Sequence, residues 1–193
     1  CSSLTSIKTP DTVKSIGKYI FNGCSQLATV TLSSIIPTIP EKAFGSCSLL
    51  KTITIPTSVT TIEKSAFYKT GLTQISIPNN VETLGDKVFD SSKSLETVSI
   101  GTGLKTVGIN PFISCTKLST ITIDSANKNF IILDDMMLSE SKSIVYSYLL
   151  GKDTTVFTIP DYVKTIKHSA FYEANNIYVM KIPMTVETLE ENA

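Results

Sequence analysis

The sequence contains no arginine and no tryptophan, and it has a single histidine. Its 17 basic residues are all lysine and balance 17 acidic residues, so the net charge is zero. Arginine provides the planar group that proteins use to bind phosphates and base edges. Because arginine is missing and no excess of positive charge replaces it, we expect no nucleic-acid partner.

Long apolar runs are also missing. No run approaches the roughly 18 apolar residues of a membrane-spanning helix, and the first residues lack the pattern of a secretory signal. We therefore expect no membrane-spanning segment in this chain. Hydrophobic residues still make up 41% of the 193 residues, which is enough for a core and argues against a disordered protein.

A repeat of 22 or 23 residues runs along the whole sequence, with one enlarged unit of 36 residues. The units start at Leu4, Leu27, Leu50, Leu72, Leu95, Leu118, Thr154 and Ile177. Apolar residues recur at matching places, and the last of these columns contains Phe21, Phe44, Phe67, Phe89, Phe112 and Phe171. One unit alone buries too little to offset the entropy of ordering it, so equivalent residues must stack. We predict a single solenoid of about eight repeats over residues 1–193.

Each unit contains two stretches that favour extended structure. The stretch L-x-x-I-x-I alternates apolar and polar residues and predicts a strand, which a proline such as Pro56 or Pro78 then ends. Equivalent strands should pair in parallel, roughly 4.8 Å apart. The V-x-x-I stretch predicts a second extended segment. We expect the stretch that ends in Ala-Phe, as in Ser65–Phe67, to form one short helical turn.

The unit L-x-x-I-x-I-P-x-x-V-x-x-I-x-x-x-A-F-x-x-C resembles the BspA-like, treponemal-type leucine-rich repeat, and residues 50–70 show it best. The resemblance implies a right-handed, curved leucine-rich repeat solenoid with a parallel sheet on one face and extended segments and short helical turns on the other. It also implies a surface or secreted protein of a bacterium or parasitic protist that adheres to host proteins and cells. Five residues depart from the pattern, namely Thr9, Ser33, Gly101, Asp124 and Pro111.

The enlarged unit, residues 118–153, exceeds the normal one by 13 residues (36 − 23) and resembles family repeats that carry an inserted hairpin. Its expected arms run from Phe130–Leu133 through Asp134 and Asp135 to Met137–Leu138 and Ile144–Leu150, with a tip at Ser139–Ser143. The insert is either a binding protrusion or an apolar cover for the stack, and we favour the cover.

The four cysteines share one column with small residues. Cys1, Cys24, Cys47 and Cys115 occupy the place that other units fill with threonine, serine or alanine. A buried free thiol suits such a place, whereas stacked positions rarely allow a disulfide. We therefore predict reduced, structural cysteines. Their spacing does not fit a metal site.

No set of residues in the sequence suggests catalysis. The lone His168 has no cysteine or second histidine near it and is expected to be exposed. The nine glycines are scattered and form no phosphate loop. Asp134–Asp135 and Glu190–Glu191 are interpreted as solvated charges. We predict a protein that is not an enzyme, with no catalytic residues, metal or cofactor.

The outward strand residues form the default contact surface of such a solenoid. The candidate binding residues are Thr29, Thr31, Thr52, Thr54, Gln74, Ser76, Thr97, Ser99, Thr120 and Thr122. An alternative is that threonine simply suits an exposed strand, since the face lacks the Tyr, Trp and Arg of binding hot spots. We predict binding of a protein partner, such as a host or extracellular-matrix protein, through this face or the insert.

Two locations remain open. The resemblance favours an extracellular or cell-surface adhesion module. The alternative is a cytoplasmic structural scaffold, which the free thiols and the absence of any N-x-[ST] site among nine asparagines favour. Both ends of the chain fall within a repeat and neither shows a polar cap. We therefore expect the natural protein to continue in both directions and expect this chain to associate end to end.

Overall fold

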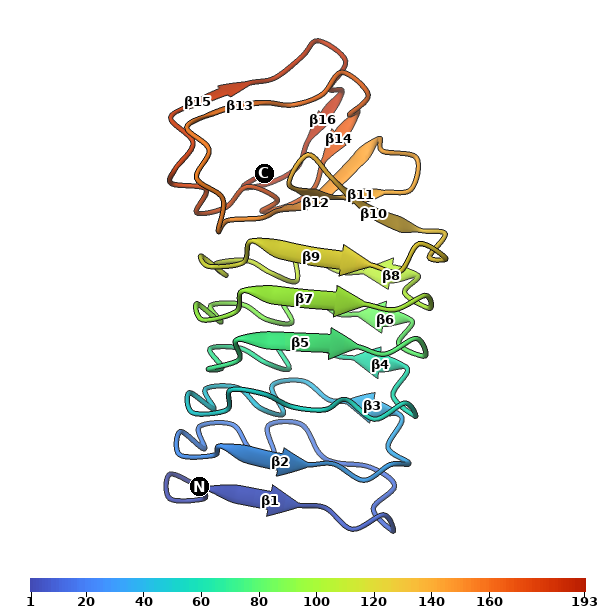
Figure 1. Ribbon diagram of the computed structural model, residues 1–193, viewed down its shortest axis with the longest axis vertical. Coiled ribbons are helices and arrows are strands. Elements are labelled where there is room, and N and C mark those ends of the chain that lie inside the picture. The colour runs from blue at the N-terminus through green and yellow to red at the C-terminus, as the bar shows by residue number, and fades with distance from the viewer.

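The computed structural model describes residues 1–193, whose repeats form a stack of coils (Figure 1). We number the coils 1 to 8 from the eight repeat starts. The first strands of the coils are β1 (Ser6–Lys8), β2 (Thr29–Thr31), β5 (Gln74–Ile77), β7 (Thr97–Ile100), β9 (Thr120–Ile123), β13 (Val156–Thr158) and β15 (Val179–Lys181). The second strands are β3 (Thr38–Ile39), β4 (Thr61–Ile62), β6 (Thr83–Leu84), β8 (Thr106–Val107), β14 (Thr165–Ile166) and β16 (Thr188–Leu189).

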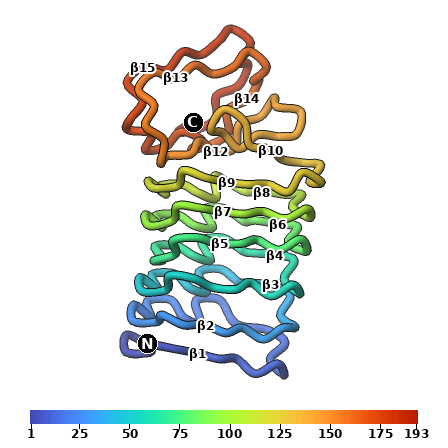
Figure 2. The backbone as a smooth tube through the Cα atoms, in the orientation of Figure 1, coloured from blue at the N-terminus to red at the C-terminus, as the bar shows by residue number.

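Strands of successive coils pair in parallel and in register with the repeat. Thr97 pairs with Gln74 on one side and with Thr120 on the other, and Thr61 of the second strands pairs with Thr38 and Thr83. These partners are equivalent positions of neighbouring repeats. The predicted parallel solenoid is therefore confirmed, and Figure 2 shows its coils lying one above the other. The right-handed sense and the curvature remain predictions.

Coil 3 differs from the expectation of one strand in every repeat. Residues 52–55 form no strand, so the first strands fall into separate sheets, with β1–β2 on one side and β5–β7–β9 on the other. Thr52 and Thr54 nevertheless point outward, and Ile53 and Ile55 are buried. Side-chain packing into the core thus places this segment without the hydrogen-bonded ladder.

The phenylalanine column forms a stack of parallel rings inside the coils. Ring centroids of Phe21, Phe44, Phe67, Phe89 and Phe112 follow each other at 5.5, 5.5, 5.5 and 5.6 Å. The last three pairs deviate from parallel by only 6° to 8°. This offset stacking is a favourable arrangement for aromatic rings, and it joins one core cluster of 35 buried residues.

The expected helical turn before each phenylalanine is wrong, since the chain contains no helix. Residues two places before the phenylalanine, such as Lys42 and Ser65, have φ values of 49° and 54°, outside the right-handed helical region. Amide groups here donate to the next coil, as from Phe44 N to Ala66 O at 2.9 Å. The segment is therefore a third inter-coil hydrogen-bond ladder, which we call the turn edge.

The insert forms three antiparallel strands where a hairpin was expected. β10 (Phe130–Leu133) pairs with β11 (Met136–Ser139), and β11 pairs with β12 (Ile144–Tyr148), so there are two turns instead of one tip. The turn at Asp134 and Asp135 has positive φ at both residues, which is typical of a tight hairpin turn. β12 then pairs in parallel with β14 and so takes the place of a second strand in coil 6.

The inserted strand β11 lies between two core clusters. Met137 packs into the N-terminal cluster, whereas Met136 and Leu138 pack into a second cluster of 11 buried residues, and all three are fully buried. Tyr148 stacks on Phe171 at 5.2 Å and takes the place of the missing phenylalanine of coil 6. The apolar residues of the insert thus complete the core, as favoured from the sequence. Figure 1 shows the coils after the insert tilted relative to those before it.

Candidate protein-binding surface

The ten candidate residues lie together on the outward side of coils 2 to 6, which we call the sheet face. Nine of them are exposed, and Ser99 is half-buried. Alternation along the strands explains this, because the intervening Val98 and Ile121 turn into the core. The sheet face therefore presents hydroxyl groups and one amide, with no charged residue among the ten.

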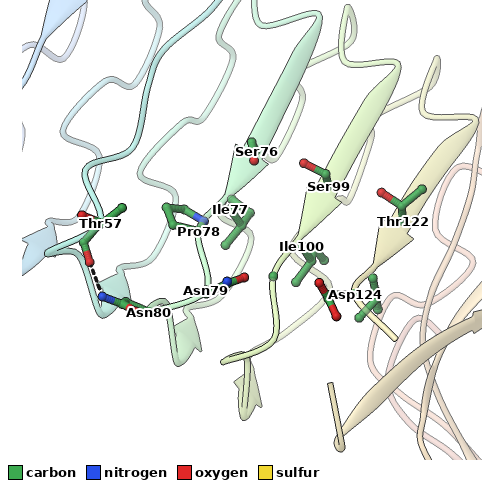
Figure 3. Close-up of a pocket in the computed structure, with 12 residues that line it drawn as sticks. Thr57, Ser76, Ile77, Pro78, Asn79, Asn80, Ser99, Ile100, Thr122 and Asp124 are labelled. Atoms are coloured by element: carbon green, nitrogen blue, oxygen red, sulfur yellow. Dashed lines mark hydrogen bonds between the residues drawn. The ribbon is translucent and has the colours of Figure 1, made fainter. Parts of the chain in front are cut away.

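Hollows line the sheet face and the ends of its strands. The largest, with a volume of about 590 Å³, lies where β5, β7 and β9 end (Figure 3). A second hollow of about 350 Å³ follows the strands themselves between coils 3 and 5. Seven of the ten candidate residues line these two hollows, namely Thr52, Thr54, Gln74, Ser76, Thr97, Ser99 and Thr122. Binding itself stays a prediction for all ten.

Departures from the repeat pattern shape the largest hollow. Gly101 replaces the proline of the I-P step, and a Cβ atom there would lie 2.3 Å from Asn79 Oδ1. Asn79 Oδ1 instead accepts a hydrogen bond from the Thr102 amide at 3.2 Å. Asp124, a second departure, accepts from the Ala126 amide through Oδ1 at 2.9 Å. Sequence reasoning found these departures but did not connect them with a cavity.

A cluster of aromatic and basic residues on the turn edge was missed from the sequence. The Lys42 ammonium lies 5.9 Å from the centre of the Tyr19 ring and 5.6 Å from that of Tyr68, and Lys69 lies 5.0 Å from Tyr68. These distances fit cation–π contacts. The residues come from three successive coils at unrelated repeat positions, so no sequence motif marks them.

Ion pairs connect neighbouring coils on the same edge. Glu41 accepts a hydrogen bond from the Tyr19 hydroxyl at 2.8 Å and one from Lys18 at 3.2 Å, and these two bonds lower the pKa of its carboxyl group. Lys167 and Glu190 make an equivalent contact at 2.6 Å, and the Lys167 hydrogen bond lowers the pKa of Glu190. Such exposed pairs contribute little to stability. They keep the charges of the edge mutually paired.

The cysteine column is structural, as predicted. All four cysteines are free, and only Cys1 is exposed. The thiol groups of Cys47 and Cys115 donate to the carbonyl oxygens of Phe21 and Phe89 in the preceding coils, at 3.2 and 3.1 Å. Burial raises the pKa of Cys47 to about 12, so the thiol stays protonated. These cysteines satisfy backbone carbonyl groups inside the stack.

The single histidine is partly buried, which corrects the expectation that it is exposed. The His168 side chain retains 23% of its exposure, because Glu191 lies 3.8 Å from its Nε2 atom and Ser169 covers its other side. The Ser169 hydroxyl and His168 Nδ1 are 2.7 Å apart, but Ser169 is only 2% exposed. A substrate cannot reach this hydroxyl, so the Ser–His contact serves packing.

The exposed part of the insert is small. Glu140, Ser141 and Lys142 are exposed, whereas Met136 to Leu138 are fully buried. Asp134 accepts a hydrogen bond from the Tyr162 hydroxyl at 2.6 Å, and Asp135 pairs with Lys152 at 2.9 Å. These acids hold the insert against coils 6 and 7 and are not simply solvated charges.

Two further searches of the structure concern metals and membranes. No group of three or more histidine, cysteine or acidic side chains is placed to hold a metal ion. No helix of the length and apolar character needed to cross a bilayer occurs.

Comparison with known proteins places these features in a family. A family model described as "BspA type Leucine rich repeat region (6 copies)" matches residues 1–119, 60–149 and 142–193. No curated protein sequence matched the chain. Among solved structures, the chain is similar to a leucine-rich repeat protein from Eubacterium ventriosum, at 25% identity and a TM-score of 0.74, over 86% of this chain and 50% of that chain.

Two other solved structures are similar. A leucine rich cell surface protein from Faecalibacterium prausnitzii shares 28% identity over 96% of this chain and 56% of its own, with a TM-score of 0.69. The pneumococcal vaccine antigen PcpA shares 20% identity over 98% of this chain and 47% of its own, with a TM-score of 0.67, which shows the fold alone. The chain thus spans about half the length of these proteins. Because the family model covers its whole length, the chain belongs to the BspA-type leucine-rich repeat family.

Proposed function

We propose that this chain is a protein-binding module of a surface or secreted protein and that its sheet face contacts a host or extracellular-matrix protein. The observation that carries the proposal is the gathering of ten polar, mostly exposed side chains over two hollows on one side of coils 2 to 6. Hydroxyl and amide groups can donate and accept hydrogen bonds, so they adapt to a polar partner surface. The cell-surface description of the Faecalibacterium protein supports the location.

The exposed tip of the insert is the second candidate contact. Glu140 and Lys142 extend from it, and this part of the chain interrupts the regular stack. Deleting the insert would also remove Met136, Met137 and Leu138 from the two cores. The contribution of the tip is therefore tested best with point substitutions that leave β11 intact.

The experiment is binding of the purified chain to immobilised collagen, laminin and fibronectin, measured by biolayer interferometry. One variant carries Thr52→Ala, Thr54→Ala, Thr120→Ala and Thr122→Ala, and the other carries Glu140→Ala with Lys142→Ala. We expect a loss of about tenfold or more in affinity, roughly 1.4 kcal/mol, for the first variant only. Equal binding by both variants and the unmodified chain would refute a role for the sheet face.

A cytoplasmic scaffold is the second candidate function, and one observation favours it. Three of four cysteines are buried and free, as in proteins of a reducing compartment. Immunolabelling of intact and permeabilised source cells distinguishes the two locations. Label on intact cells supports the surface role, and label only after permeabilisation supports the scaffold.

End-to-end self-association is part of the proposal for the isolated chain. Its last coil exposes apolar side chains, with Tyr178 80% exposed, Leu189 58% exposed and Met184 fully exposed. Exposed apolar groups gathered on one face favour association. Sedimentation velocity should show concentration-dependent dimers that Met184→Lys reduces, and a monomer at all concentrations would contradict the proposal.

A further inference from the structure

A groove crosses the strand ends from coil 2 to coil 6. Three hollows of about 350, 590 and 450 Å³ lie along this line. The first two share Thr57, and the second and third share Thr122 and Asp124, so the three form one continuous depression. Successive coils are roughly 4.8 Å apart, so the groove is roughly 20 Å long and runs parallel to the stack.

The groove is lined with neutral polar groups. Its walls combine hydroxyl groups, such as those of Ser76 and Ser99, with the amides of Asn79 and Asn80. Asp124 is the single charged residue along the three hollows, and no lysine lines them. An anionic ligand would find no counter-charge there. An uncharged ligand with many hydroxyl groups would find both donors and acceptors.

Several of these groups have free hydrogen-bonding capacity and are held in place. Asn79 uses Oδ1 for the Thr102 amide, which leaves its Nδ2 group for a ligand. Asp124 uses Oδ1 for the Ala126 amide and leaves Oδ2. Figure 3 shows both side chains at the strand ends beside Ser99 and Thr122. Binding groups that the fold already orders lose less entropy when a ligand arrives.

The spacing of the coils distinguishes between polymeric ligands. Equivalent hydroxyl groups recur once per coil, about every 4.8 Å. An extended peptide repeats its side-chain direction every two residues, roughly 6.7 Å, and would fall out of step with the coils. A pyranose ring in an extended sugar chain has a length close to the coil spacing. A linear sugar chain can therefore repeat the same contacts in each coil.

From the shape, lining and spacing of this groove, we propose that it binds a linear, uncharged glycan along the stack, with one sugar ring per coil. The proposal goes beyond the protein contact because it assigns a different class of ligand to the strand ends and does not depend on that contact. No aromatic side chain lies beneath the central hollow. The affinity for one ring is therefore low, and the repetition across coils supplies the binding.

The experiment is titration of the purified chain with neutral β-1,4-linked glucose and mannose oligosaccharides of two to six rings, by isothermal calorimetry. We expect the affinity to rise with length and to level off near five rings, the number of coils that the groove crosses. Heparin and a neutral, polar ten-residue peptide serve as competing probes. Absence of binding by every neutral oligosaccharide at millimolar concentration, or preferred binding of heparin or the peptide, would overturn the proposal.

Two groove variants and a control locate the ligand. Ser99→Phe fills the middle of the groove and should weaken hexasaccharide binding about tenfold or more, whereas Thr158→Phe, at an outward position of β13 outside the groove, should leave it unchanged. Asp124→Asn, which keeps the acceptor for Ala126, should weaken binding several-fold without affecting the fold. Equal affinities for Ser99→Phe, Asp124→Asn and Thr158→Phe would overturn the assignment to this groove.

Discussion

Replacing a phenylalanine in the middle of the ring stack should destabilise the chain more than the same change at the end of the stack. Phe67 is fully buried and stacks on two rings, Phe44 and Phe89, each at 5.5 Å. Phe21 is 9% exposed and stacks on Phe44 alone. Substitution by leucine keeps an apolar side chain but removes the ring contacts, so it isolates the stacking contribution.

The expected magnitudes follow from the number of ring contacts. Aromatic pairs contribute about 0.5–1.5 kcal/mol each beyond their burial, so Phe67→Leu should lower the free energy of unfolding by about 1–3 kcal/mol. Phe21→Leu should lower it by about half as much, because one contact is lost. Phe67→Ala adds a cavity and should cost about 3–5 kcal/mol or more.

Urea unfolding followed by far-ultraviolet circular dichroism measures these differences. The transition midpoints of the three variants should fall in the order Phe21→Leu, Phe67→Leu and Phe67→Ala, the last being the lowest, with similar slopes. Equal midpoints for Phe21→Leu and Phe67→Leu would refute the argument that stacking between coils stabilises the protein. A change of less than about 0.5 kcal/mol in Phe67→Ala, the usual range of surface substitutions, would refute it as well.

Further predictions follow from single residues. A thiol reagent at pH 8 should modify Cys1 alone in the native chain and all four cysteines after unfolding, since Cys47 is buried with a pKa near 12. Tyr148→Phe should raise the unfolding midpoint, because the buried Tyr148 hydroxyl has no partner and an unsatisfied group costs about 1–3 kcal/mol. The pKa of Glu190 lies below its ordinary value of 4.5 in the folded chain, so its pairing with Lys167 stabilises above that value and is lost as the pH falls through the folded pKa. Glu190→Gln should therefore be less stable than the unmodified chain at pH 7 and equal to it at low pH, by thermal unfolding.

The repeat columns could be read from the sequence because they depend on burial, which follows composition directly. Leu27, Leu50 and Leu72 recur at fixed spacing, and all are fully buried. The outward sheet residues follow from alternation in the same way. The division of residues 1–193 into one domain stays a prediction, as does binding by the sheet face.

The turn edge could not be read from the sequence because its backbone depends on left-handed conformations at ordinary residues. Lys42, Ser65 and Lys87 all have positive φ, and none is the glycine or asparagine that signals this conformation. Tyr148 was missed for another reason, because the 13 additional residues of coil 6 move it out of the phenylalanine spacing. Hollows at the strand ends depend on how Asn79 and Gly101 of adjacent coils fit together, which one repeat does not reveal.

The most direct test of this account is whether equivalent outward residues of successive coils form one row at constant spacing. Spin labels at Ser6→Cys and Thr97→Cys, four coils apart, and at Ser6→Cys and Thr120→Cys, five coils apart, can be compared by pulsed electron resonance with Cys1 replaced by serine. Strand spacing predicts Cα separations of roughly 19 and 24 Å, so the label distance should increase by about 5 Å. A distance that is equal or shorter in the second pair would contradict the stacked solenoid on which both proposed binding surfaces depend.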